Sequence, residues 1–405
     1  MSAPFDPELR YPQPWSALKE ADNPYTAHHH DRTGRLLDRL APSIERNTER
    51  VARMRGFGRR QPAVVTPRGS VFPRREPGAA ATELVFRGND GVERVLADDF
   101  APSLLHPDFT GYWVSPDGRY VAYSQSKAAD EGGATLHVVR TDTGEAVCPP
   151  TPGALYTTGA WVEPSPGDPS AEAVFVYSTA ARRSLYEDWT PYVRRFAADG
   201  THRDAPLAVA PNAPAGTQYH FTAGPEPGTV TVLTCRHAIN TPTGIEIVDV
   251  EQRGRGQEIQ RESEGVLARV QVGPRRSDGT RQLFMMRLDP ESGHRGRVVT
   301  VEAPAEPGGP PRFREVVAGQ AGDILRDMVI VDRGPDQPPA LALSVRRHGG
   351  EVRIDLVSLR ETADGAATAD HRWTVPLPDA QPITAADGST QITGNYGLVT
   401  GLSAT

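Results

Sequence analysis

The fold is decided by the stretch Gly111-Tyr-Trp-Val-Ser-Pro-Asp-Gly-Arg-Tyr-Val-Ala-Tyr-Ser-Gln-Ser126. Residues 112–114 have the composition of a short inner strand, and residues 120–124 that of a second strand. Ser-Pro-Asp-Gly at 115–118 supplies the turn between them, because Pro fixes φ and Gly accepts the positive φ that a hairpin needs. The stretch therefore predicts a β-hairpin.

The next segment, Thr135-Leu-His-Val-Val-Arg-Thr-Asp-Thr-Gly-Glu145, extends this hairpin. Residues 136–140 predict a third strand, and the turn at 142–145 leads to an outer strand that carries Val147. Four strands in about forty residues are the repeat unit of a β-propeller. We therefore expect one complete propeller blade at 109–149.

Similar short β-runs follow one another from Ala63 to the C-terminus, at a spacing of about fifty residues. The expected blades are 63–98, 109–149, 155–208, 218 to about 259, 265–301 and 324–375. The residues from Pro382 onward suffice for about half a seventh blade. Since an unpaired sheet edge there would favour aggregation, we expect the N-terminal arm or a partner chain to cover it.

Residues 1–60 differ from the rest of the chain. Apolar residues recur there at helical spacing, at Leu36, Leu37, Leu40, Ile44 and Val51. The predicted fold class is therefore all-β. We expect a seven-bladed β-propeller at 61–405, with a short or incomplete seventh blade, and a helical N-terminal arm at 1–60.

The composition limits the function classes. The chain has 405 residues with 39 Gly and 38 Pro, too many turn formers for a helical or doubly wound protein. A net charge of −7 argues against a nucleic-acid partner. The first thirty residues are Pro-rich and charged, and no run of eighteen apolar residues occurs, so we expect no membrane contact and a cytoplasmic protein. Cys148 and Cys235 form no CxxC pair, and we expect both to be reduced.

A family resemblance follows from the order of several motifs. Tyr11-Pro, Asp22-Asn-Pro-Tyr25, a helix, a strand pair, Ala97-Asp-Asp and the 111–124 stretch resemble the N-terminal half of the prolyl oligopeptidase family. The resemblance covers essentially the whole chain. In that family a seven-bladed propeller caps an α/β-hydrolase domain. One departure is that the arm has Thr26-Ala27 and His28-His29-His30 where the family usually has a Trp.

The catalytic half of that family has no counterpart in this sequence. A serine hydrolase places its nucleophile on a strand-to-helix elbow of the form G-x-S-x-G, and this motif does not occur in the chain. The resemblance therefore implies a pseudo-peptidase, a propeller without the hydrolase domain, and no catalytic residue of the family can be carried over. We expect no peptide hydrolysis by this chain alone.

The predicted site lies at one mouth of the central tunnel. In a propeller of this type, the loops between second and third strands, and those entering each inner strand, gather on one face. These loops are expected at 127–134, 179–191, 235–243, 274–280 and 346–350. We expect a small-molecule or peptide-like ligand to bind there.

The first candidate group lies in the loop at 182–192. Its carboxylates are Glu187 and Asp188, and its aromatic residues are Tyr186, Trp189 and Tyr192. Together they suit a cationic or aromatic ligand, which charge and stacking would hold. The alternative is that this loop packs over a blade edge.

The second candidate group combines Arg236 and His237 with Tyr219 and His220 on the neighbouring inner strand. A His near neutral pKa serves as a general acid or base, and Arg236 would fix a carboxylate. We therefore name His237, Glu187, Asp188 and His220 as catalytic candidates, and the remaining residues of both groups as binding candidates. The alternative is ordinary polar residues at a strand end.

Inner strands supply further binding candidates. Arg326 and Asp327 could reach the tunnel, where an Asp with a raised pKa would act as a base, or they form a simple ion pair. Tyr112 and Trp113 alternate, so one is expected to face the tunnel and the other a neighbouring blade. The run at 28–30 predicts no metal site, because consecutive His side chains point in different directions. We expect no cofactor.

Two functions remain open. The first is a biosynthetic tailoring enzyme, in which acid–base groups at the tunnel mouth promote a cyclisation, isomerisation or elimination without a cofactor. The second is a non-catalytic binding or regulatory module, or a partner of a separately encoded hydrolase. A homodimer is a further expectation, and an inactive peptidase fragment is a third reading.

Overall fold

The protein is described by a computed structural model. It describes residues 63–74, 82–100, 111–126, 134–154, 157–168, 170–180, 189–209, 216–236, 241–251, 256–261, 266–276, 280–288, 295–302, 311–331, 338–347, 352–362, 367–375, 392–394 and 397–399. These residues belong to the unit Arg60–Thr405. Every regular element among them is a β-strand, which confirms the all-β class. The predicted arm at 1–60 lies outside the described residues.

The strands form six four-stranded antiparallel sheets and one two-stranded sheet, which we number in chain order. Sheets one to three consist of β1 (Val64–Thr66), β2 (Gly69–Arg74), β3 (Glu83–Gly88), β4 (Glu93–Ala97), β5 (Tyr112–Val114), β6 (Tyr120–Ser126), β7 (Ala134–Arg140), β8 (Thr151–Pro152), β9 (Gly159–Val162), β10 (Ala171–Ala180), β11 (Trp189–Ala197) and β12 (His202–Pro206).

Sheets four to seven complete the described part of the chain. They consist of β13 (Gln218–Ala223), β14 (Thr229–Arg236), β15 (Thr241–Asp249), β16 (Gln257–Arg261), β17 (Val266–Arg275), β18 (Arg281–Leu288), β19 (Arg297–Glu302), β20 (Arg312–Ala318), β21 (Asp323–Val331), β22 (Ala340–Arg347), β23 (Val352–Glu361), β24 (Ala367–Val375), β25 (Ile392–Gly394) and β26 (Gly397–Val399).

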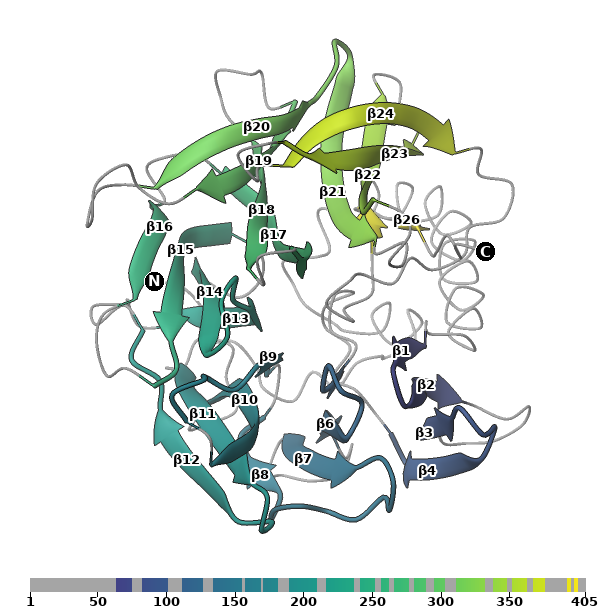
Figure 1. The fold of residues 1–405 in the computed structure, drawn as a ribbon, viewed down its shortest axis with the longest axis vertical. Helices are drawn as coiled ribbons and strands as arrows, with labels where there is room; N and C mark the ends of the chain where they lie inside the picture. Colours follow the sequence, from purple (N-terminus) through teal and green to yellow (C-terminus); the bar gives the residue numbers. More distant parts are fainter. Residues whose placement is uncertain are drawn as a thin grey trace, which may run out of the picture. The chain divides into compact units, whose positions relative to one another are not determined.

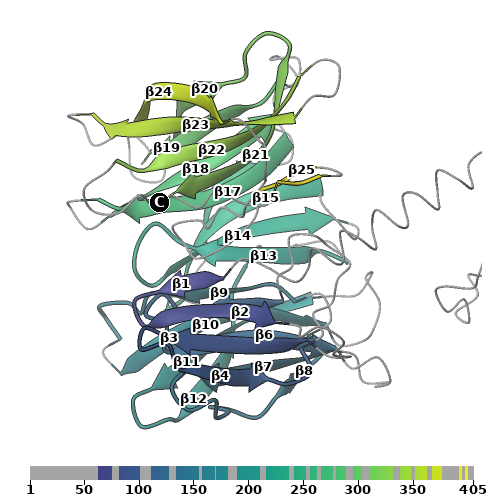
Figure 2. The same cartoon turned by 90° about the vertical axis from the view of Figure 1, so that its right-hand side faces the viewer.

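Within each sheet the strands pair in chain order. The first strands of consecutive sheets also lie next to one another, since β5 contacts β9, β9 contacts β13, β13 contacts β17, and β17 contacts β21. Figure 1 shows the sheets arranged like blades with their first strands innermost, and Figure 2 shows the same sheets from the side. This arrangement is the one predicted from the hairpin at 111–126.

The core lies between the sheets rather than inside one of them. Five buried clusters join, in turn, sheets one and two, two and three, three and four, four and five, and five and six. Because strand side chains alternate between the two faces, each of sheets two to five presents apolar residues on both faces. Tyr112 and Trp113 illustrate this alternation, with Tyr112 packed toward sheet one and Trp113 toward sheet three.

The predicted turn at 115–118 is confirmed. The Gly118 amide donates to the Ser115 carbonyl oxygen over 2.8 Å, and Gly118 has a φ of 72°. The Ser115 hydroxyl donates to Asp117 Oδ1 over 2.6 Å and accepts from the Tyr120 amide over 2.9 Å. These hydrogen bonds fix the register of β5 on β6.

Two outer strands differ from the prediction. The fourth strand of sheet two is β8 at Thr151–Pro152, beyond the expected end of the blade at 149, and not a strand that carries Val147. The fifth predicted blade ended at 301, whereas β20 pairs with β19 as a fourth strand. Its residues Arg312, Arg314 and Glu315 are polar and only partly buried or exposed. An outer strand carries a weak apolar alternation, and here that pattern is almost lost.

The antiparallel order also gives the sheets two distinct ends. We call "mouth end" the end at which first strands begin and second strands finish, and "hairpin end" the opposite one. The mouth end matches the predicted site face, with one correction: the segment 274–280 connects β17 to β18 and so lies at the hairpin end. There the Arg276 amide donates to the Thr280 carbonyl oxygen over 2.7 Å.

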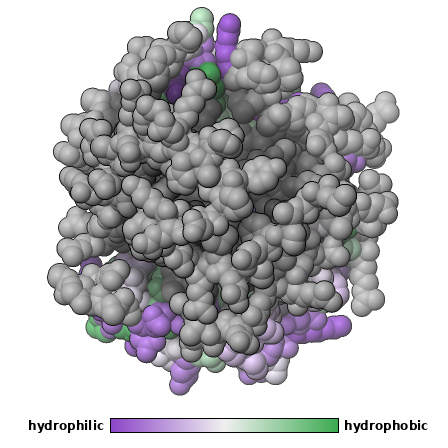
Figure 3. Space-filling view, turned by 180° about the vertical axis from the view of Figure 1, so that it is seen from behind, coloured by the Kyte–Doolittle hydropathy of each residue, from purple (hydrophilic) through white to green (hydrophobic). Residues whose placement is uncertain are grey.

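Exposed large hydrophobic side chains are few in the described part of the chain. Val65 in β1 is 68% exposed, and Val95 in β4 and Ile324 in β21 are exposed to a lesser degree. In Figure 3 the described residues that reach the rim are mainly hydrophilic. No helix among the described residues is long and apolar enough to cross a membrane.

Candidate functional site at the mouth end of sheets three and four

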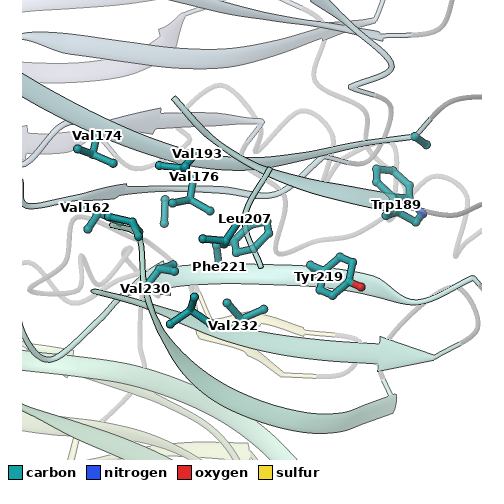
Figure 4. Packing of buried hydrophobic residues seen from close by; sticks show 14 residues of the cluster. Val162, Val174, Val176, Trp189, Val193, Leu207, Tyr219, Phe221, Val230 and Val232 are labelled. Carbon is teal, nitrogen blue, oxygen red and sulfur yellow. The ribbon is translucent and has the colours of Figure 1, made fainter. Parts of the chain in front are cut away.

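Trp189 and Tyr219 lie in one buried cluster at the mouth end of two neighbouring sheets. Trp189 is the first residue of β11, and Tyr219 is the second residue of β13. Each side chain is only 6% exposed. Figure 4 shows the indole nitrogen of Trp189 and the hydroxyl of Tyr219 on the same side of the cluster. The other buried members of the cluster are aliphatic or aromatic: Ala160, Val162, Val174, Val176, Ala180, Val193, Leu207, Phe221, Val230, Val232, Val248 and Val250.

The indole N–H of Trp189 has no hydrogen-bond partner within the described part of the structure, although the atom is buried. Trp161, in the first strand β9 of the same sheet, provides a contrast. Its indole N–H donates to the Trp113 carbonyl oxygen over 2.9 Å. Buried donors are nearly always paired in proteins. An unpaired donor at the mouth end therefore marks a place where a ligand atom would be stabilised.

Backbone contacts position Trp189. Ala180, the last residue of β10, pairs with Trp189 across the sheet. The Ala180 amide donates to the Gly153 carbonyl oxygen over 3.0 Å. Gly153 has a φ of 77°, and a Cβ there would lie 2.5 Å from the Ala180 carbonyl oxygen. Only glycine fits this approach without strain.

A side-chain contact fixes Tyr219 in the same way. The Thr158 hydroxyl, just before β9, donates to the Tyr219 carbonyl oxygen. This hydrogen bond joins the mouth ends of sheets three and four. Thr158 and Gly153 were both missed by the sequence analysis. The Thr151-Pro-Gly153 turn was the only signal that could have pointed to Gly153.

His220 does not share this cluster with Tyr219. The two are adjacent in β13, so their side chains point to opposite faces of sheet four. His220 pairs with Leu233, and Gln218 with Cys235, on the face toward sheet five. Cys235 is 2% exposed, and burial raises the pKa of its thiol to about 12. The thiol therefore stays protonated at neutral pH and is a poor nucleophile.

No protein-family model matches the sequence, and no curated protein matches it. Among solved structures, one from a study of two prolyl endopeptidases matches with a TM-score of 0.51 and 18% identity, over 77% of this chain and 41% of that chain. The prolyl oligopeptidase B of Galerina marginata, as apo protein, matches with a TM-score of 0.53 and 14% identity, over 79% and 44% of the two chains.

A third solved structure is the same Galerina marginata enzyme, as a mutant bound to a 35mer hydrolysis and macrocyclization substrate. It matches with a TM-score of 0.51 and 13% identity, over 89% of this chain and 51% of that chain. The fold is that of the prolyl oligopeptidase propeller. This chain spans about half the length of these solved structures, and at such identities the likeness concerns the fold alone.

The propeller separates Tyr192 from Trp189, contrary to the prediction of one aromatic group. Tyr192 comes three residues after Trp189 in β11, so its side chain lies on the opposite face of the sheet, toward sheet two. There its ring stacks on Tyr177, with centroids 5.7 Å apart. Tyr192 is therefore a packing residue between sheets two and three.

The alternation predicted for Tyr112 and Trp113 is confirmed, but the expected tunnel position is not. Tyr112 packs edge-on against Phe100, with ring centroids 6.0 Å apart. Trp113 packs against Phe175, with centroids 5.9 Å apart. Each side chain faces a neighbouring sheet, because the inner edge of a radial sheet consists of backbone.

Arg326 and Asp327 lie at an irregularity of β21. The register shifts between Leu325 and Asp327, so Arg326 is the extra residue of a β-bulge. Asp327 is 5% exposed, and its Oδ1 accepts from the Met328 amide over 2.8 Å. Asp327 thus lies within the sheet, well away from the Trp189 cluster.

The remaining candidates lie outside the described residues: Tyr186, Glu187, Asp188 and His237. Arg236 is the last residue of β14 and pairs with Thr241, and its side chain is outside the described set. These positions remain predictions. Within the described ranges, no group of three His, Cys, Asp or Glu side chains could hold a metal ion.

Proposed function

We propose that the chain is a non-hydrolytic propeller that binds a peptide-like or small-molecule ligand at the mouth end of sheets three and four. The observation that carries this proposal is the buried, unpaired indole N–H of Trp189 beside Tyr219. Rigid aromatic side chains with one fixed polar atom are typical of ligand sites. The absence of a G-x-S-x-G motif from the sequence supports a function without a serine nucleophile.

A peptide-like ligand is favoured by the fold. The Galerina marginata enzyme of the same fold has been solved with a bound 35mer hydrolysis and macrocyclization substrate. In this proposal the two strands β25 and β26 begin a seventh blade. In the same proposal the ligand enters at the mouth end of sheets three and four.

The chemistry proposed for the bound ligand is acid–base tailoring, such as a cyclisation, isomerisation or elimination. His237, Glu187 and Asp188 come from the two connections at this mouth end, and they would move protons without a cofactor. The indole of Trp189 does not ionise, so the charge of the proposed site depends on His237, Glu187 and Asp188.

The test uses a panel of N-acetylated, C-amidated tripeptides, with binding followed by native mass spectrometry and conversion by liquid chromatography. We expect adducts with the wild type, and loss of conversion in His237→Ala and Glu187→Gln with affinity changed less than about twofold. Arg275→Ala, at the hairpin end, is the matched control and should behave as wild type. Cleavage of the peptides by the wild type would contradict the non-hydrolytic proposal.

The second candidate, a binding or regulatory module, is favoured by one observation. The buried side chains packed around Trp189 and Tyr219 are aliphatic and aromatic. Such side chains can contact an apolar ligand but transfer no proton. Adducts without conversion by the wild type would decide for this module.

A further inference from the structure

We propose that the Trp189 indole N–H is the hydrogen-bond donor that recognises the ligand at the mouth end. It binds a neutral amide carbonyl oxygen of an apolar ligand. This inference rests on the proposed function and names the chemical class that the site accepts. It makes Trp189 a specificity-determining residue, beside Tyr219 in the same buried cluster.

The Trp189 donor is buried and has no partner within the described part of the structure. An indole N–H is a donor only, and its direction is fixed by the ring, so it cannot turn toward another acceptor as a hydroxyl can. Its burial without a partner destabilises the unliganded protein, since its hydration is lost and not replaced. A ligand oxygen at this position would recover that free energy, which makes the donor a source of affinity and selectivity.

The Trp189 donor also differs from other unpaired groups in its place in the sheet. The hydroxyls of Thr231 and Ser344 are also buried without a partner among the described residues. Both of these lie in the middle of a strand, in β14 and β22, between packed sheets. Trp189 is the first residue of β11, at the mouth end. Its indole nitrogen and the Tyr219 hydroxyl lie on the same side of the cluster (Figure 4).

The buried side chains that pack with Trp189 and Tyr219 are aliphatic and aromatic. Among them a carboxylate would lose its hydration in exchange for one uncharged donor, which disfavours it strongly. An amide carbonyl needs only one good donor, and an apolar group beside it gains from contact with the rings and the aliphatic side chains.

The structure also offers an internal control. Trp161 has the same side chain and a similar burial, but its N–H already donates to the Trp113 carbonyl oxygen over 2.9 Å. A ligand that acts through the Trp189 donor must change the Trp189 signal and leave the Trp161 signal unchanged. Non-specific binding or unfolding would change both.

The experiment is a titration of the full chain, labelled with ¹⁵N-tryptophan, followed by the indole N–H cross-peaks. The probes are N-acetyl-phenylalanine methylamide, which is neutral, and N-acetyl-phenylalanine, which carries a carboxylate. Trp189→Phe and Trp161→Phe assign the two cross-peaks. The expected result is a saturable downfield shift of the Trp189 proton with the methylamide, an unmoved Trp161 peak, and at least tenfold weaker binding of the carboxylate.

Trp189→Phe keeps an aromatic ring and removes the donor, so we expect its affinity for the methylamide to fall about tenfold. An unchanged Trp161 peak in this variant shows that sheet three is folded. If the variant does not fold, the wild-type titration decides alone. Binding that shifts backbone signals of β11 and β13 without moving the Trp189 indole peak would overturn the inference and leave the proposed function standing. If neither probe shifts any signal at the mouth end, the inference and the proposed binding of peptide-like ligands both fail.

Discussion

Arg194 donates two parallel hydrogen bonds to Asp204, from Nε to Oδ1 over 2.7 Å and from Nη2 to Oδ2 over 2.6 Å. The guanidinium is nearly fully buried between sheets two and three. It also donates to the Cys148 sulfur over 3.1 Å and to the Thr151 hydroxyl over 2.8 Å. One side chain thus joins the outer strands of two sheets.

Replacement of Arg194 by Leu should therefore destabilise the fold. We expect a loss of about 2–4 kcal/mol, because Thr151 and Asp204 would be left without their donor. Urea unfolding followed by circular dichroism measures the loss. Arg140→Leu is the matched control, since its pair with Asp142 is exposed and should contribute less than about 1 kcal/mol. Equal losses in the two variants would contradict this assignment.

The two cysteines should be unreactive in the folded protein. Burial raises the pKa of the Cys148 thiol and raises that of Cys235 to about 12. Because the thiolate is the reactive form, labelling with a disulfide reagent at pH 8 should be slow until the chain is unfolded. Rapid labelling of either thiol in the native state would refute this.

The same shift predicts a loss of stability at high pH. In the unfolded chain the Cys235 thiol ionises near pH 9, whereas in the folded chain it keeps its proton to about pH 12. The folded state then binds more protons, so stability falls as pH rises through this window. Cys235→Ala should flatten the fall in unfolding free energy between pH 9 and pH 11, measured by urea titration. A fall of the same size in this variant would assign it to other groups.

Asp355 should support the fold above pH 4 and lose that effect below it. Burial alone would raise the pKa of Asp355, but hydrogen bonds from Arg353, Arg372 and Thr374 outweigh it and hold this pKa below its ordinary value. The unfolded state therefore takes up the proton first, and stability decreases as pH falls.

Asp355→Asn tests this network. We expect it to cost about 2–4 kcal/mol at pH 7 and clearly less at pH 3, in unfolding measured by urea titration. Asp142→Asn, in an exposed pair, should cost less than about 1 kcal/mol at either pH. A loss that is the same at both pH values would show that the charge of Asp355 is not the cause.

Gly153→Ala should disturb the mouth end specifically. The new Cβ would approach the Ala180 carbonyl oxygen to 2.5 Å, and Ala180 pairs directly with Trp189. We expect a loss of about 2–3 kcal/mol and a shifted Trp189 indole signal. Gly91→Ala has a similar φ of 80° but open space around it, so it should cost only about 1–2 kcal/mol and leave that signal in place. Equal effects on the Trp189 signal would refute the coupling.

Much of the architecture follows from local sequence. Ser115-Pro-Asp-Gly118 encodes its own hairpin, since the Pro ring, the Gly φ and the Ser and Asp hydrogen bonds all act within four residues. Short apolar runs between such turns gave most strands to within a few residues. The outer strand β20 was missed, because a half-exposed strand carries little apolar alternation.

The candidate site depended on information that no local pattern holds. Whether Tyr219 or His220 joins Trp189 is set by the register of β13 on β14 and by which neighbouring sheet each face meets. The same applies to Tyr192. It comes three residues after Trp189 in β11, so its side chain lies on the opposite face and stacks on Tyr177. The unpaired state of the Trp189 N–H depends on every acceptor around it, and these come from separate sheets.

The sequence by itself determined that this chain folds into consecutive four-stranded sheets, because turn chemistry and strand alternation act over a few neighbouring residues. Only the tertiary structure decided which aromatic and polar side chains meet. Packing between sheets brings together residues some thirty positions apart, such as Trp189 and Tyr219, and a shift of one residue in register would exchange the two faces.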